Sequence, residues 1–184
     1  MMLLSVDPGQ SGALAICDPT AGRVDVYAMP DTSMDAVNVI RKYSDPARFP
    51  VRTAYVEELV KHMGVGIPAS TMAVYASNWG VIVGALMAFG WKIVRVRPQE
   101  WQRALGLGIT GRQKSQITQG MSPNEVKAEK KRVRLLNGQL KRDWKSKLRG
   151  RAQELYPNIT VTLGNADALL ILSYAIQKEK GNAA

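Results

Sequence analysis

The sequence predicts an α/β fold: a mixed five-stranded sheet of three antiparallel and then two parallel strands, with helices on both faces. Three short apolar or alternating segments, 3–7, 13–17 and 24–29, are joined by short turns, as in an antiparallel meander. Two later strand-like segments, 53–57 and 91–96, each follow a helix-like stretch. Strands reached through helical crossovers run parallel, so we expect both to run parallel to the first strand.

The predicted helices are placed by their start and stop signals. Residues 33–43 and 70–89 are helix-like, and Gly90 gives the second of them a stop signal. Pro98 suits the first position of a short helix. A last helix is predicted from about residue 165 to about 178.

The pattern also predicts two basic helices, 123–136 and 139–155, separated by Asn137-Gly138. The first begins with Ser122-Pro123-Asn124-Glu125, which supplies a Ser cap, Pro at the first position and Glu at the third. We interpret the whole chain as a single domain with a basic helical insertion at about residues 112–142.

Small residues recur every four positions on the predicted helix 70–89, at Ala76, Gly80, Gly84 and Ala88. This spacing makes one smooth face, where another backbone can approach closely. The face is either a seam between helix and sheet or a subunit interface. We favour the seam, with dimer contacts through a neighbouring face.

Composition excludes several classes of protein. The chain has 184 residues and is 46% hydrophobic, which is enough for a core and argues against disorder. The one cysteine, Cys17, cannot form a disulfide within the chain, which favours a reducing, intracellular setting. We expect no signal peptide, and no apolar run that reaches the roughly 20 residues of a membrane span.

The net charge of +10 is concentrated in one segment. Residues 103–151 hold 14 of the 25 Lys and Arg, against Glu125, Glu129 and Asp143. The rest of the chain is close to neutral. A local cationic field of this size suits a polyanion such as nucleic acid, although a solvated face kept basic for solubility is the alternative.

Acidic residues occupy unusual positions at the ends of apolar segments. Asp7 ends the first predicted strand, Glu57 and Glu58 end the fourth, and Asp167 lies in the first turn of the last helix. Sites in open α/β sheets form outside the carboxyl ends of parallel strands, so these acids can converge. Carboxylates that converge without cations repel, but they are sensible ligands for Mg²⁺.

Each acid also has an ordinary structural explanation. Asp7 before Pro-Gly can cap a turn, Glu57 and Glu58 can be solvated, and Asp167 can complement a helix dipole. Together with the basic segment, the acids favour a metal-dependent nuclease.

Four segments resemble the RuvC family of Holliday-junction resolvases, within the RNase H-like superfamily. The segments are SVDPGQSGALAI, YVEELV, the helix 70–89 and NADALLILSYA. The RPQEW segment, WKSKLRGRAQELYP and the late DALL look most like phage-encoded members. The resemblance covers nearly the whole chain except about 112–142. It implies an RNase H-like fold and a homodimer that cuts four-way junctions or related branched DNA, in the cytoplasm of a bacterium or of a phage-infected host.

The resemblance implies particular site residues. Asp7, Glu57 and Asp167 would bind Mg²⁺, or Mn²⁺ in its place, with two ions per site, and Glu57 matches the family pattern better than Glu58. Lys145 would act at the scissile phosphate, or it would be a lysine that follows the phosphate backbone. A further acid or His of the family, three residues before Asp167, is replaced by Gly164. Asn165, Glu58 or water could substitute for it.

The DNA contacts are predicted from the basic helices. The residues are Lys130, Lys131, Arg132, Arg134, Lys141, Arg142, Lys147 and Arg149. The loop after Glu57 offers Val60, Met63 and Val65 as an apolar wedge, and His62 as a loop or DNA-contact residue. The four tryptophans could stack on unpaired bases, but core packing is the expected role for most of them.

Three other functions remain open from the residues. A protein on the same fold could bind branched DNA without cutting it, or an RNase H could cut RNA–DNA hybrids. Sugar-kinase-like ATPases open with a similar DPGxxxG segment. No second glycine-rich phosphate loop follows a later strand here, and 184 residues are too few for their paired domains.

Overall fold

The computed structural model describes residues 1–58 and 68–182 and contains a sheet of five strands in the order β3-β2-β1-β4-β5. The strands are β1 Met2–Asp7, β2 Ala13–Asp18, β3 Arg23–Ala28, β4 Arg52–Glu57 and β5 Lys92–Val96. The first three strands pair antiparallel, whereas β4 lies parallel to both β1 and β5. The predicted mixed sheet is therefore confirmed.

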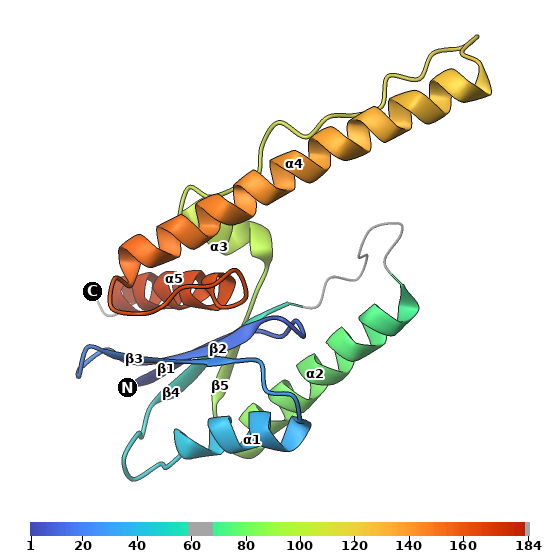
Figure 1. Cartoon of the computed structure of the whole chain (residues 1–184). Coiled ribbons are helices and arrows are strands. Elements are labelled where there is room, and N and C mark those ends of the chain that lie inside the picture. Colours follow the sequence, from blue (N-terminus) through green and yellow to red (C-terminus); the bar gives the residue numbers. More distant parts are fainter. Residues whose placement is uncertain (59–67, 183–184) are drawn as a thin grey trace.

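Helices cover both faces of this sheet (Figure 1). They are α1 Ser33–Lys42, α2 Ala69–Ala88, α3 Pro98–Ala104, α4 Pro123–Leu155 and α5 Ala166–Asn182. Alternation along β1 separates two cores: Leu3 packs with α3, α4 and α5, whereas Leu4 and Val6 pack with α1 and α2. The α5 face carries the candidate site.

The two basic helices predicted around Asn137-Gly138 are one continuous helix, α4, of 33 residues. The predicted capping box at Ser122 and Glu125 does begin it. Asn137 does not end the helix because its amide is used elsewhere: it accepts from the Gln113 N–H at 2.9 Å and donates to the Gln113 carbonyl at 2.8 Å. The segment before α4 is thereby tied to the side of the helix, and the two form an arm that extends from the body (Figure 1).

The small-residue face of α2 is not a seam with the sheet, so that prediction was wrong. Ala76, Gly80, Gly84 and Ala88 are exposed. The sheet instead contacts larger side chains in the C-terminal half of α2, among them Ile82 and Leu86, which bury more apolar surface.

Among the helices that the structure describes, α2 alone is long and apolar enough, by length and composition, to cross a membrane. The expectation that no apolar run reaches this length was therefore wrong. However, α2 connects β4 to β5, which are paired in the same sheet. Only its C-terminal part is buried against that sheet, through Ile82, Val83, Ala85 and Leu86.

Candidate active site

Two carboxylates stand side by side at the C-terminal edge of the sheet. Asp7 is the last residue of β1 and Glu57 the last of β4. Val6 pairs with Val56 in the parallel register, so the next residue on each strand is an acid. Side chains alternate between the two faces of a sheet, so Asp7 and Glu57 lie on the same face as Tyr55, which packs in the core under α5.

A third carboxylate, Asp167, comes from the first turn of α5. Ser5, two residues before Asp7, donates from its buried hydroxyl to the Ala168 carbonyl at 2.7 Å. This bond holds the start of α5 over β1, because buried polar groups need hydrogen-bond partners. Lys145 of α4 donates to Asp167 Oδ2, so α4 also contributes to the site.

Burial and mutual repulsion raise the pKa values of the two strand-end acids. The pKa of Asp7 rises to about 6, first through burial and then through the charge of Asp167. The pKa of Glu57 rises to about 8 through burial, followed by the charges of Asp7 and Asp167. Lys145 opposes both shifts. Three acids in this setting favour a cation that can neutralise them.

Sequence reasoning missed two neighbours of these acids. Trp101 is fully buried, and its indole N–H donates to Glu57 Oε1 at 3.3 Å. On α2, burial and the charges of Glu57 and Asp7 raise the pKa of Tyr75. The RPQEW segment singled out Trp101 in the sequence, but nothing local distinguishes Tyr75 from other apolar positions of its helix.

The position of Gly164 is closed to a side chain. A Cβ there would lie 2.6 Å from the Ser11 carbonyl oxygen. Neither residue suggested as a substitute is free for the role. Asn165 accepts from the Thr162 N–H at 2.8 Å, and Glu58 pairs with Arg97 at 3.0 Å.

Glycine is also required at position 12. A Cβ on Gly12 would lie 2.2 Å from the Asp7 carbonyl oxygen and 2.9 Å from its carboxyl carbon. In the same turn, the Gly9 N–H donates to Asp7 Oδ1 at 3.1 Å. The turn therefore caps Asp7 and still leaves its carboxylate at the lip of the sheet.

The chemistry of the acids suits a hard divalent cation, although the side chains are not gathered around one centre. Within residues 1–58 and 68–182, no three Asp, Glu, His or Cys side chains stand close enough to hold one ion together. Asp167 Oδ1, however, is buried and accepts no hydrogen bond, and its other oxygen is held by Lys145. An unpartnered buried carboxylate oxygen beside two desolvated acids fits an oxygen-ligated ion such as Mg²⁺.

The tryptophans are engaged within the protein. Besides Trp101, Trp79 donates to the Glu57 carbonyl at 3.1 Å, Trp91 to Ser44 at 2.8 Å and Trp144 to the Leu107 carbonyl at 2.7 Å. The expected core role describes them better than base stacking. The predicted wedge residues Val60, Met63 and Val65 and the neighbouring His62 lie outside the described residues.

The eight residues predicted to contact DNA all lie on α4, as does Lys145. Arg132 pairs with Glu129 at 2.8 Å. The N-terminal part of α4 extends away from the sheet, whereas its C-terminal part lies against α5 (Figure 1). Leu148 and Ala152 make this packing. The basic segment and the acids therefore share one helix.

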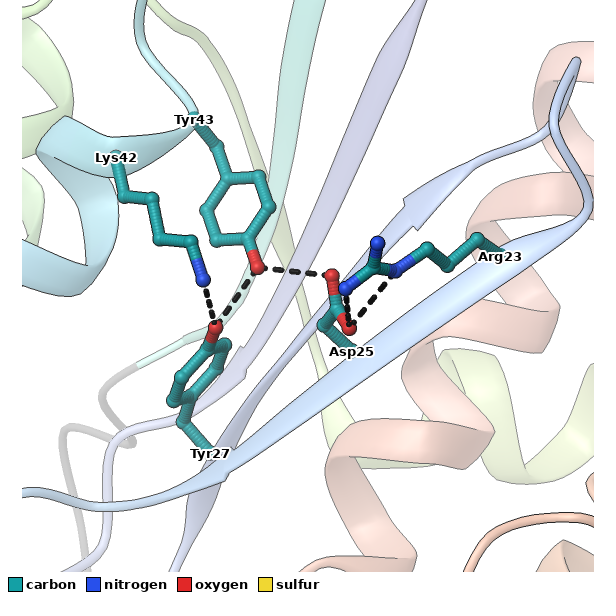
Figure 2. Close-up of polar contacts among 5 residues, drawn as sticks. All are labelled: Arg23, Asp25, Tyr27, Lys42 and Tyr43. Carbon is teal, nitrogen blue, oxygen red and sulfur yellow. Dashed lines mark hydrogen bonds and ion pairs between the residues drawn. The ribbon is translucent and has the colours of Figure 1, made fainter.

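A second polar cluster lies along the edge strand β3, beside the end of α1 (Figure 2). Tyr43 donates to Asp25 at 2.9 Å, Arg23 pairs with the same carboxylate at 3.0 Å, and Lys42 donates to Tyr27 at 2.8 Å. These residues tie β3 to the end of α1 beside a cavity of about 290 Å³. Because Asp25 is already bonded on both oxygens, this cluster joins two elements and leaves no free carboxylate for chemistry.

The fold and the site define an α/β protein with carboxylates at the C-terminal edge of a mixed five-stranded sheet. The sequence matches no protein-family model and no curated protein. Among solved structures, it is similar to RuvC from T. thermophilus in complex with a Holliday junction substrate, at 15% identity and a TM-score of 0.47. That alignment covers 98% of this chain and 97% of the other.

A second structure, of RuvC from Thermus thermophilus, has the same coverage and identity and a TM-score of 0.49. At 15% identity, the likeness concerns the fold alone.

Proposed function

We propose that this chain is a metal-dependent, structure-selective endonuclease that hydrolyses phosphodiester bonds in Holliday junctions or related branched DNA. One observation carries the proposal. Asp7 ends β1, Glu57 ends the adjacent β4, and Asp167 of α5 is bonded by Lys145 of α4, a helix whose cations suit a polyanion. Acids arranged to repel, next to a phosphate-binding surface, are the expected components of a nuclease site.

Asp7, Glu57 and Asp167 would hold Mg²⁺ or Mn²⁺, as two ions in the form the resemblance implies. Bound there, the ions would activate a water for attack on the phosphorus and stabilise the departing oxygen. The chain's own groups prepare the site. Gly9 fixes Asp7, and Trp101 holds Glu57 through its indole. Lys145 would exchange its bond to Asp167 for a phosphate oxygen, where its charge is favourable.

A homodimer follows from the proposed substrate, because two symmetric cuts in a four-way junction need two sites. The exposed face of α2 offers an apolar surface for a second copy, with Gly80, Gly84 and the 68% exposed Met87. Substituting Gly84 with Arg should shift the protein to a monomer in sedimentation experiments. Substituting the exposed Gly150 of α4 with Arg is the control. If Gly84→Arg stays dimeric, this surface is excluded.

The central test is cleavage of labelled DNA. Four-way junctions, forks, flaps and linear duplexes are incubated with the protein and Mg²⁺, and products are resolved on denaturing gels. We expect symmetric cuts at or near the crossover. Asp7→Asn should lower the rate by at least about a hundredfold while binding persists. Asp18→Asn is the matched control, since Asp18 ends β2 and only accepts from turn amides.

Two outcomes would replace the proposal. If the wild-type protein binds junctions tightly with Mg²⁺ or Mn²⁺ but yields no product, it is a branched-DNA-binding protein without nuclease activity. If it cuts RNA–DNA hybrids faster than any branched DNA, the RNase H alternative holds. The absence of the usual fourth ligand at Gly164 makes the first comparison informative.

A further inference from the structure

The charges of α4 are sorted onto opposite flanks of the helix. At about 100° per residue, eight of its cations fall within an arc of about 120°. They are Lys127, Lys130, Lys131, Arg134, Lys141, Arg142, Lys145 and Arg149. We call this arc the basic flank. The four acids of α4, Glu125, Glu129, Asp143 and Glu154, all fall on the opposite side.

The ion pairs follow the same division. Off the basic flank, Arg132 pairs with Glu129 and Arg151 with Glu154, each at 2.8 Å. On the basic flank, and counting only partners among the described residues, Lys145 alone forms an ion pair. The other seven cations therefore present uncompensated charge along one line of the helix. Solubility does not require cations to lie along one line. Such an arrangement matches the spaced charges of a linear polyanion.

Gly138 lies on the basic flank, between Arg134 and Lys141. Its backbone is not left-handed, and a Cβ there would meet nothing nearer than the Arg142 side chain at 3.7 Å. Neither the backbone conformation nor packing within the protein requires glycine at this position. In a helix interior, glycine lowers the stability by about 1 kcal/mol relative to alanine. A gap in the side chains would let another molecule's backbone approach the helix closely.

The basic flank leads to the candidate site. Lys145 belongs to it, and its ammonium bonds Asp167. From Lys127 to Lys145 the helix rises by about 27 Å, which matches about eight base pairs of B-DNA. The aromatic residue of α4, Trp144, faces away from the flank and donates to the Leu107 carbonyl. Single-strand-binding surfaces use aromatic stacking, so the flank suits a duplex better.

We propose that the basic flank of α4 is a track for the phosphate backbone of one duplex arm of the DNA, leading that arm to the carboxylates at Lys145. This inference rests on the proposed function and specifies how the substrate lies. It also divides the predicted DNA contacts. Arg132 and Lys147 fall outside the track, whereas Lys127 joins it.

Matched triple variants test the track. One replaces Arg134, Lys141 and Arg149 with Gln on the basic flank. The control replaces the near neighbours Arg132, Lys147 and Arg151 with Gln and removes the same charge. Affinity for junctions with arms of about 12 base pairs is measured in EDTA at several salt concentrations. We expect the flank variant to bind at least about tenfold more weakly, with a salt slope lower by about 2 to 3, and the control to change the slope by less than about 1.

Arm length and Gly138 provide independent readouts. Shortening the arms to about four base pairs should weaken the wild type more than the flank variant, because the short arms no longer reach along the helix. Gly138→Leu should bind more weakly although its melting temperature is unchanged or higher. Melting curves of all variants check that they fold. A flank variant that does not fold is replaced by the single changes, whose losses should add.

Equal losses in the two triple variants would overturn the track, since net charge alone would then account for binding. Insensitivity to arm length, or an equal loss for single strands, would also overturn it. Binding is measured without metal, so the two proposals can fail separately. Cleavage with an unimportant flank would refute the track alone, and a flank-dependent affinity without cleavage would refute the nuclease alone.

Discussion

At the scale of residues, the site depends on neutral partners that hold the acids in place. Trp101 carries no charge and was predicted to pack, yet it supplies the N–H that orients Glu57. Ser5 is an alcohol in an apolar strand, and it sets where α5 begins. Both side chains are buried. Their hydrogen bonds therefore contribute more to stability, because water cannot replace them.

Trp101→Phe keeps an aromatic ring at this buried position and removes the bond to Glu57. A hydrogen bond to a charged group contributes about 1.5–3 kcal/mol, so the cleavage rate should fall about tenfold to a hundredfold. The rate on a labelled junction measures this. Trp144→Phe, which loses a bond to the Leu107 carbonyl, is the control for an indole N–H away from the acids. A rate that survives Trp101→Phe would show that Glu57 needs no such support.

Gly164→Ala should destabilise the protein by about 1–3 kcal/mol, because the new methyl group meets the Ser11 carbonyl at 2.6 Å. Gly164→Asp should do the same and should not restore a fourth acid. Gly150→Ala, where nothing lies within 4 Å, should instead stabilise the protein slightly. Chemical denaturation measures all three. A stable Gly164→Asp variant with faster cleavage would contradict this account.

At the scale of elements, α4 joins two tasks in one rigid unit. Its C-terminal half packs on α5 and delivers Lys145, while its N-terminal half carries four of the eight cations of the basic flank. The segment before it runs back along the arm and is bonded to it through Gln113 and Gln116. A continuous helix therefore couples the position of the DNA arm to the position of the carboxylates.

Asn137→Ala removes both bonds between α4 and Gln113. We expect amide hydrogen exchange around Gln113 to rise at least about tenfold while the global melting temperature changes little, since the arm is remote from the core. Hydrogen-exchange mass spectrometry measures this. The exposed Asn124, near the start of the same helix, provides the control substitution to Ala. Unchanged exchange at Gln113 would mean that other contacts hold the segment.

At the scale of the whole molecule, the buried acids oppose folding at high pH. The pKa values of Asp7 and Glu57 are raised to about 6 and about 8. Protons are therefore kept in the folded state at pH values where the unfolded chain has lost them. The contribution of these two acids to the free energy of unfolding is fully present below their pKa values in the unfolded chain. It is lost as the pH rises through the folded pKa values of about 6 and about 8.

Without metal, the wild type should therefore lose stability relative to the double variant Asp7→Asn, Glu57→Gln between about pH 4 and 8, by on the order of 1–3 kcal/mol. Urea denaturation at each pH measures the difference. Adding Mg²⁺ at about pH 8 should raise the melting temperature of the wild type and not of the variant. Parallel pH profiles would show that the two acids are better solvated than the structure indicates.

The sequence alone determined the sheet. Alternation and short turns along residues 2–29 leave few other arrangements, and crossover helices impose the parallel strands. It also determined that Asp7 and Glu57 end adjacent strands, because both acids follow apolar segments and register is a local consequence of pairing.

Only the tertiary structure decided what depends on long-range packing. Asn137-Gly138 is a stop signal in isolation, but contact with Gln113 lets α4 continue through it. The small residues of α2 make a smooth face, but larger side chains bury more apolar surface and so take the sheet side. The closure of position 164 and the bond from Trp101 to Glu57 join segments far apart in the chain, and no local pattern records such contacts.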